Sequence, residues 1–167
     1  MAKAWKFQNN INTDQIIPGR YYPRENVEEL GEFCLCELHP KFAKEKQKGD
    51  IIVGGSNFGC GSSREYAPIA LKYSGVKCII AKSFARIFYR NCINLGFPIL
   101  VCKECYDEIT EGDDIDVNLE SGEIKNNTSG KKYNAQPLPE FVLKIVDAGG
   151  MINYLKEQAN SENTNEV

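Results

Sequence analysis

The sequence predicts an α/β fold in which helices flank a mostly parallel central sheet. Apolar stretches at 50–55, 76–81 and 97–102 alternate with segments of helical spacing at 64–73 and 84–95. Strands that are apolar on both faces and joined by helical crossovers are typical of parallel pairing between layers of helices. The length of 167 residues fits a single domain with its own core.

Shorter elements are expected on either side of this core. Asn26, with Glu29 three residues later, has the pattern of a capping box, which predicts a helix that ends at Pro40. Ser83 is the expected cap of the helix that follows the second buried strand. The apolar positions of the helix capped by Asn26 lie at 27–34. The remaining predicted elements are a strand at 3–7, a hairpin with strands at 115–118 and 123–126, and helices at 141–147 and 151–158.

Composition and charge narrow the class of protein. A hydrophobic fraction of 42% is ordinary for a soluble globular protein, and a net charge of −3 argues against bulk binding to nucleic acid or to an anionic membrane surface. No apolar run approaches the roughly 20 residues of a membrane helix, and residues 1–6 lack the apolar stretch of a signal peptide. We therefore expect a cytoplasmic protein with one domain at 1–158 and a flexible polar tail at 159–167.

The cysteines are interpreted as small buried thiols. There are seven of them, and an odd number without a signal peptide argues against a disulfide framework. Cys102 and Cys105 form a CxxC pattern, and Cys34 and Cys36 a CxC pattern. A structural zinc site needs four ligands, and His39 is the only histidine. No metal ligand is therefore expected in this chain.

The segment with the clearest chemistry is 54–65, a glycine-rich loop between a predicted strand and a predicted helix. Glycines let the backbone approach a ligand closely, and a helix N-terminus directs N–H groups at it. Ser62, Ser63 and Arg64 add two hydroxyls and a guanidinium fork, which suit a carboxylate or a phosphate. The spacing matches neither a phosphate-binding P-loop, a dinucleotide fingerprint nor a serine-hydrolase elbow.

Two interpretations of Ser62 are compatible with the spacing. Ser62 and Glu65 fit the S-x-x-E capping box, so Ser62 could simply begin a helix. Pro68, however, is tolerated only in the first turn, which places the helix start nearer Arg64 and leaves Ser62 in the loop. The first interpretation is structural, and the second leaves Ser62 available to a ligand.

A second basic cluster follows the next predicted strand. Arg86 and Arg90 are four residues apart and share one helical face. Such a pair is usually a solvated surface, but its place after the carboxyl end of a strand is where crevices form in open α/β sheets. The sequence is compatible with both interpretations of Arg86 and Arg90, as a solvated surface or as part of a ligand crevice.

Together these motifs resemble those of a known family. The segments 57–65 (NFGCGSSRE), 81–88 (AKSFARIF) and 12–18 (NTDQIIP) are similar to the swivelling domain of aconitase-type dehydratases. The resemblance covers about residues 5–157 and implies a single swivelling β/β/α domain. A free-standing chain of this size resembles the small subunits of the 3-isopropylmalate dehydratase group. In that group a separate large subunit carries a [4Fe-4S] cluster. Many relatives have histidine where this chain has Tyr66.

The resemblance also implies roles for individual residues. Ser62 falls on the catalytic serine, the base that removes a carbon-bound proton, and Asp14 on an acidic active-site residue. Ser63 and Arg64 fall on contacts to the substrate carboxylate, and Gly61 belongs to the same substrate-binding loop. The cluster of the partner subunit would bind the leaving hydroxyl as a Lewis acid. An isolated serine is a weak base, and Arg64 with the helix N-terminus is expected to stabilise its alkoxide.

In the family, the loop after Gly19 contacts the variable part of the substrate. Alignment with the family places Pro23 at the position in this loop that distinguishes one substrate from another. An apolar Pro23 favours an alkyl-bearing hydroxy acid, which points to isomerisation of 2-isopropylmalate to 3-isopropylmalate in leucine biosynthesis, or to dehydration of 2,3-dimethylmalate. Arg24, if it faces inward, favours a tricarboxylate and a homoaconitase-type subunit. A non-catalytic anion-binding module is the alternative of another class, since a fold alone does not fix a function.

Overall fold

The structure is a computed structural model that describes residues 1–22 and 25–164, with side chains to Ser161. Its centre is a parallel sheet, as predicted, with four strands in the order β1-β2-β3-β4. These strands are β1 (Ala4–Phe7), β2 (Ile51–Gly54), β3 (Cys78–Ala81) and β4 (Ile99–Val101). Every residue of β2 and β3 is buried, because other elements cover both faces of the sheet.

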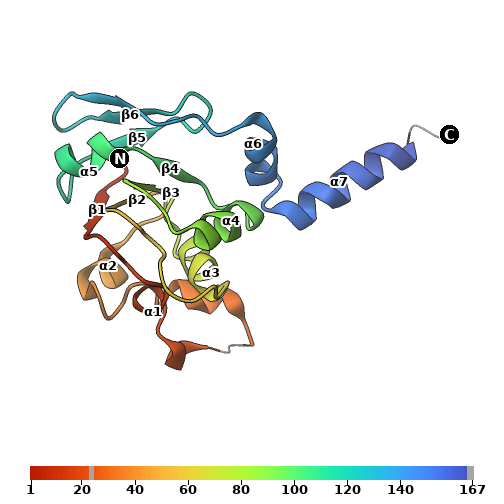
Figure 1. Ribbon diagram of the computed structural model, residues 1–167, viewed down its shortest axis with the longest axis horizontal. Helices are drawn as coiled ribbons and strands as arrows, with labels where there is room; N and C mark the ends of the chain where they lie inside the picture. The colour runs from red at the N-terminus through yellow and green to blue at the C-terminus, as the bar shows by residue number, and fades with distance from the viewer. Residues whose placement is uncertain (23–24, 165–167) are drawn as a thin grey trace.

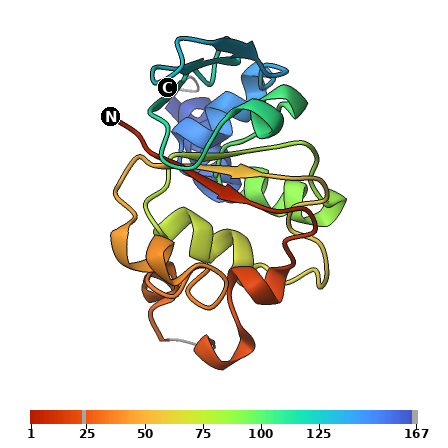
Figure 2. The ribbon, with the colours of Figure 1, turned by 90° about the vertical axis from the view of Figure 1, so that its left-hand side faces the viewer.

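Helices and a second sheet supply that cover (Figures 1 and 2). In Figure 2, α3 lies below the parallel sheet, and α5 lies above it with the second sheet. The helices are α1 (Thr13–Ile16), α2 (Pro40–Glu45), α3 (Tyr66–Tyr73), α4 (Arg86–Asn94), α5 (Lys103–Glu108), α6 (Glu140–Asp147) and α7 (Met151–Thr164), with 3-10 helices at Gly19–Tyr21 and Val27–Gly31. None of the helices in the described ranges has the length and apolarity to cross a membrane.

The predicted hairpin is confirmed and is larger than expected. β5 (Ile115–Val117) pairs antiparallel with β6 (Glu123–Asn126), which pairs antiparallel with β7 (Lys132–Asn134). The third strand was not predicted, because a three-residue strand with two exposed polar positions carries little sequence signal. This small sheet covers the parallel sheet from the side of α5 (Figure 1).

Several helix boundaries differ from the sequence prediction. Pro40 begins α2 instead of ending a helix, and the preceding segment forms only the short 3-10 helix Val27–Gly31. Proline is favoured at the first helical position because its missing N–H has no partner there. Ser83 does not cap α4, whose cap residue is Ala85; its hydroxyl instead accepts a hydrogen bond from the backbone N–H of Asn57 at 2.8 Å.

The C-terminal helix is also longer than expected. α6 and α7 are separated at Gly149 and Gly150, as predicted, but α7 continues to Thr164 and so includes the first part of the segment expected to be a flexible tail. Figure 1 shows α7 extending away from the rest of the domain. Among its side chains, Ile152 and Leu155 are 71% and 57% exposed.

Asp50 joins the first strand to the second. It is only 3% exposed, and its carboxylate accepts hydrogen bonds from the backbone N–H of Lys3 at 3.0 Å, the indole N–H of Trp5 at 2.8 Å and the backbone N–H of Gln47 at 3.0 Å. A buried carboxylate with three donors is satisfied, whereas its removal leaves all three donors without a partner.

We predict that Asp50→Ala lowers the free energy of unfolding by about 2 kcal/mol or more. The buried indole N–H of Trp5 loses its partner at a cost of about 1–3 kcal/mol, and two partly buried backbone N–H groups lose theirs. Urea unfolding followed by circular dichroism measures the change. The exposed Asp147 is the matched control, and Asp147→Ala should stay within about 0.5 kcal/mol of the parent. Equal stability of the two variants would contradict the role of Asp50.

Candidate functional site

The candidate site forms where the loops after β1 and β2 meet. The backbone N–H of Gly59 donates to the carbonyl of Ile11 at 2.7 Å, and that of Thr13 donates to the carbonyl of Cys60 at 2.9 Å. Asn12 and Cys60 also form an isolated parallel bridge. Both loops leave the carboxyl ends of neighbouring parallel strands, which is where ligand crevices form in such sheets.

Two glycines allow this close approach. Gly59 has φ +80°, and a Cβ there would lie 2.1 Å from Cγ of the Phe88 ring. Gly61 has φ +96°, and its Cβ would lie 3.4 Å from Oγ1 of Thr13. Both residues therefore need the left-handed conformation that glycine adopts without strain. Gly61 in this way brings the Ser62 loop against α1.

Ser62 lies in the loop and caps no helix. α3 begins at Tyr66, its cap residue is Glu65, and no side chain makes a capping hydrogen bond there. The capping interpretation of Ser62 is therefore wrong, and the loop interpretation is confirmed, with Pro68 in the first turn as expected. Ser62 is exposed, and its Oγ lies 3.1 Å from Oγ1 of Thr13.

Arg64 and Asp14 are brought together from separate elements. Nη1 of Arg64, just before α3, donates to Oδ1 of Asp14, on α1, at 3.1 Å, and also donates to the hydroxyl of Tyr22. The Arg64 and Asp14 side chains are 49% and 65% exposed. An ion pair this accessible to water contributes about 0–1 kcal/mol, so it commits little of the binding capacity of Arg64 and leaves the guanidinium available to a ligand carboxylate.

Two tyrosines complete this side of the site. The rings of Tyr22 and Tyr66 stack with centroids 4.4 Å apart and planes 21° apart. Tyr66 therefore supports Tyr22, which contacts Arg64. Sequence reasoning missed Thr13 and Tyr22, although both are in or beside segments that it had singled out. No spacing rule indicates which side chain of a loop faces a partner far away in the sequence.

The other predicted site residues are less closely joined. Ser63 is exposed, and its carbonyl accepts a hydrogen bond from the Asn91 amide of α4 at 3.4 Å. Arg86 and Arg90 are exposed and line a separate surface hollow of about 350 Å³, which Ser62 and Arg64 do not line. Pro23 and Arg24 lie outside the described residues.

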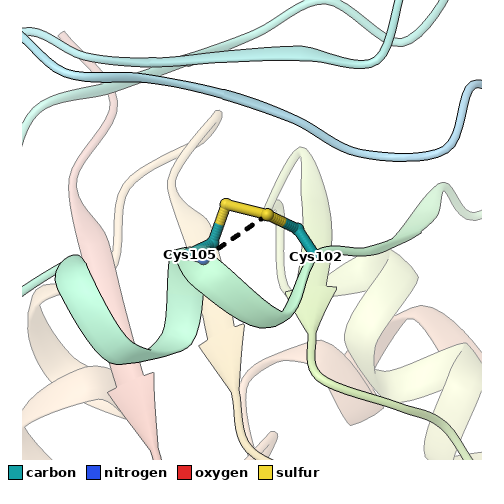
Figure 3. The surroundings of a disulfide bond; sticks show 2 residues. All are labelled: Cys102 and Cys105. Atoms are coloured by element: carbon teal, nitrogen blue, oxygen red, sulfur yellow. Dashed lines mark hydrogen bonds between the residues drawn. A yellow bond between two sulfur atoms is a disulfide. The ribbon is translucent and has the colours of Figure 1, made fainter.

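The expectation that every cysteine is a free thiol is wrong for one pair. Cys102 and Cys105 are disulfide-bonded, and Figure 3 shows the bond across the first turn of α5. Cys102 is the cap residue of α5, and the backbone N–H of Cys105 donates to its sulfur at 3.4 Å. The helical turn holds the two Cα atoms 5.5 Å apart, within the range that a disulfide spans. Sequence reasoning missed α5 and therefore this proximity.

The other five cysteines are thiols in two environments. Cys34, Cys78 and Cys92 are buried, whereas Cys36 and Cys60 are partly exposed. Burial raises the pKa of Cys34 and Cys78 to about 12 and raises that of Cys92 well above its ordinary value. In the part of the chain that the structure describes, no three His, Cys, Asp or Glu side chains gather in a way that could hold a metal ion.

A model of the aconitase C-terminal domain matches residues 4–104. The chain belongs to the aconitase C-terminal domain family. The matched segment runs from β1 into the start of α5, so it contains the whole parallel sheet and both loops of the candidate site.

Similar proteins extend the match to nearly the full chain. The isopropylmalate/citramalate isomerase small subunit of Methanocaldococcus jannaschii is 53% identical over 94% of this chain and 94% of its own length. The 3-isopropylmalate dehydratase small subunit 1 of Thermotoga maritima is 53% identical over 95% of this chain and 96% of its own length. A crystal structure of a 3-isopropylmalate dehydratase from M. jannaschii gives a TM-score of 0.92 at 41% identity, covering 98% of this chain and 97% of that one. The resemblance of the motifs and the predicted fold are confirmed.

We predict that a thiol reagent at about pH 8 labels Cys36 and Cys60 in the native chain and leaves the other cysteines unmodified. A thiol of pKa about 12 is about one part in ten thousand thiolate at that pH, and the thiolate is the reactive form. Intact-mass spectrometry counts the labels. Unfolding without a reductant should add Cys34, Cys78 and Cys92, and reduction should add Cys102 and Cys105. Rapid native labelling of Cys34 would contradict its burial.

Proposed function

We propose that this chain is the small subunit of an iron–sulfur hydro-lyase that interconverts 2-isopropylmalate and 3-isopropylmalate by dehydration and rehydration. The observation that carries the proposal is the loop at 62–64, in which an exposed serine hydroxyl that caps no helix and an accessible guanidinium are two residues apart. The family membership and the names of relatives that match nearly the full chain at about half identity support it.

In the proposed reaction, Ser62 is the base that removes the carbon-bound proton. In the dehydration half, its alkoxide takes the carbon-bound proton, which becomes the Ser62 hydroxyl hydrogen, and the electron pair of the broken C–H bond forms the double bond as hydroxide leaves. In the hydration half the same hydroxyl returns the proton to the neighbouring carbon while hydroxide adds to the other. Proton and hydroxide are thus both recovered, so the isomerisation is balanced, and Ser62 is general base and then general acid.

Arg64 is the proposed contact for the substrate carboxylate next to the reacting carbon. Among the described residues, both hydrogen bonds of its guanidinium are made by Nη1, to Asp14 and to Tyr22. A guanidinium carries five N–H donors in a fixed fork, so Nη2 and Nε are available for a second, bidentate partner. As negative charge spreads onto the carboxylate in the transition state, such a contact strengthens.

Asp14 and the glycine-rich loop have supporting roles in this proposal. Asp14 holds the guanidinium in place before substrate binds and balances its charge afterwards. The Ser63 hydroxyl and the backbone at Gly61 are proposed to donate to the same carboxylate, since both lie beside Ser62 in the loop. Positively charged and N–H groups on one side of the reacting carbon hold the substrate in a single orientation.

The proposed partner is a large subunit that carries a [4Fe-4S] cluster. When bound, the cluster supplies a Lewis acid for the leaving hydroxyl. The names of the relatives describe them as small subunits, which supports a heteromeric enzyme. Ser62, Asp14 and Arg64 are all exposed here, so a partner that covers them would complete the site and exclude water from it.

The substrate is proposed to be a malate with an alkyl substituent. The M. jannaschii relative is named for isopropylmalate and citramalate, which both carry one. The stacked rings of Tyr22 and Tyr66 beside Arg64 offer an apolar surface rather than a second cation, which also fits an alkyl group. We therefore place the reaction in leucine biosynthesis, in the cytoplasm, with dimethylmalate as the next substrate to assay and a tricarboxylate after it.

We predict that Ser62→Ala, assembled with the cluster-bearing large subunit, loses turnover of 2-isopropylmalate, because no base remains for the carbon-bound proton. The absorbance of the alkene intermediate in the ultraviolet measures the rate, and size-exclusion chromatography measures assembly, which should be unchanged. Ser161→Ala, on α7 away from the site, is the control and should turn over normally. A normal rate in the Ser62 variant would refute the proposed function, and assembly without any activity in the parent would favour a non-catalytic module.

We predict that Arg64→Ala lowers kcat/KM by about tenfold to two hundredfold, since a hydrogen bond to a charged group is worth roughly 1.5–3 kcal/mol. Arg64→Lys should recover only part of the loss, because lysine keeps the charge without the fork. Steady-state kinetics of the assembled enzyme measure both. Lys131→Ala, which removes a cation that pairs with Glu108, is the control. Equal kinetics of all three variants would exclude Arg64 from the site.

A further inference from the structure

The hydroxyl of Thr13 is buried against the proposed base. Thr13 is the first residue of α1 and is 3% exposed, although the neighbouring Asp14 is largely exposed. Its Oγ1 lies 3.1 Å from Oγ of Ser62. Within the described residues this is the one hydrogen bond of the Thr13 side chain. The buried Thr13 hydroxyl therefore has the exposed Ser62 hydroxyl as its single partner.

The surroundings fix Thr13 in this position. Its backbone N–H donates to the carbonyl of Cys60 at 2.9 Å. Asn12 and Gln15 form a complete capping box around it, with Gln15 N–H donating to Oδ1 of Asn12 at 2.8 Å and Asn12 N–H donating to Oε1 of Gln15 at 2.9 Å. Gly61 packs beside Oγ1. The threonine backbone is therefore held on both sides, and burial restricts the movement of its side chain.

Among the described residues, the groups expected to stabilise the Ser62 alkoxide make no hydrogen bond to its Oγ. Arg64 directs Nη1 to Asp14 and Tyr22, and the helical N–H groups of α3 begin at Tyr66, beyond the loop. The described side-chain donor next to Ser62 Oγ is Thr13. In the neutral pair either hydroxyl can donate, but an alkoxide has no hydrogen, so Thr13 is then the donor of the pair.

We infer that Thr13 is a positioning residue that donates its buried hydroxyl hydrogen to Ser62 Oγ and stabilises the alkoxide on which the proposed function rests. The donated hydrogen occupies the inward lone pair of Ser62 and leaves an outward lone pair for the substrate proton. When Ser62 takes that proton, the new hydroxyl hydrogen stays on the outward side, ready to return to carbon. Thr13 keeps its own proton throughout.

This arrangement has a predictable effect on the pH profile. A donor that binds the charged form of an acid lowers its pKa, and in a poorly hydrated site the effect is larger than in water. Removal of the Thr13 hydroxyl therefore makes the alkoxide harder to form, which lowers kcat and moves its ascending pH limb to higher pH. Substrate affinity depends on other groups, so KM should change little.

The sharpest test compares Thr13→Ser with Thr13→Ala in the enzyme assembled with its large subunit. Both variants lose the γ-methyl group, and they differ only in the hydroxyl. We expect Thr13→Ser to keep kcat within about threefold of the parent. We expect Thr13→Ala to lose about tenfold to a hundredfold in kcat, with KM within about twofold and the ascending limb displaced upward. Thr13→Val, nearly isosteric with the parent, should behave like Thr13→Ala, and Thr110→Val at an exposed threonine is the control.

The kinetics of the Thr13 variants either support or overturn the role of the Thr13 hydroxyl. Equal kcat and equal pH profiles for the serine and alanine variants would overturn the inference, as would equal losses in both, which would indicate packing by the methyl group. If Thr13→Val does not assemble, the serine–alanine comparison still stands, because those two share the same cavity. Failure of the proposed function is distinguishable, since it appears as normal turnover in Ser62→Ala, whereas an inactive Ser62→Ala with an unchanged Thr13→Ala overturns this inference alone.

Discussion

The backbone hydrogen bonds between the loops after β1 and β2 are the constraint on which the site depends. The links from Gly59 to Ile11 and from Thr13 to Cys60 continue the pairing of the two parallel strands beyond the sheet. The first loop leads into α1, which carries Thr13 and Asp14, and the second carries Ser62 and Arg64. This pairing therefore sets the distance between their side chains. A loop without Gly59 could not pass the Phe88 ring, so α4 behind it also fixes the geometry.

The parallel sheet was predictable because its strands are apolar on both faces, and the loop was predictable because glycines, serines and an arginine follow such a strand directly. The features that were predicted wrongly or missed depend on contacts between distant segments, or on residue types that are compatible with more than one structure. Proline both ends and begins helices, so Pro40 alone could not decide which. The Cys102–Cys105 bond required knowing that a helix begins there, and the Thr13–Ser62 contact joins residues 49 positions apart.

The charged groups of the site are accessible to water, whereas the hydroxyl of Thr13 is buried. Arg64 and Asp14 are about half exposed or more, and their ion pair is screened by water and therefore exchangeable. In a site covered by a partner, the same charges would be desolvated and would interact more strongly with a bound carboxylate. A weak, solvent-accessible ion pair is consistent with the proposal that the site reaches full electrostatic strength only on assembly with a large subunit.

In the Thr13–Ser62 pair the Thr13 hydroxyl is buried, in contrast to the exposed ion pair. A neutral hydroxyl can be buried permanently at modest cost when it has one hydrogen-bond partner. A buried arginine beside Ser62 would lower its pKa further, but would itself need a paired charge and would compete with the substrate carboxylate for it. A neutral donor stabilises the alkoxide without attracting the substrate to the wrong side of the base. In the proposed mechanism the two tasks are therefore separate: exposed charged groups bind the substrate carboxylate, and a buried neutral hydroxyl stabilises the base, with the capping box of α1 fixing the backbone that carries it.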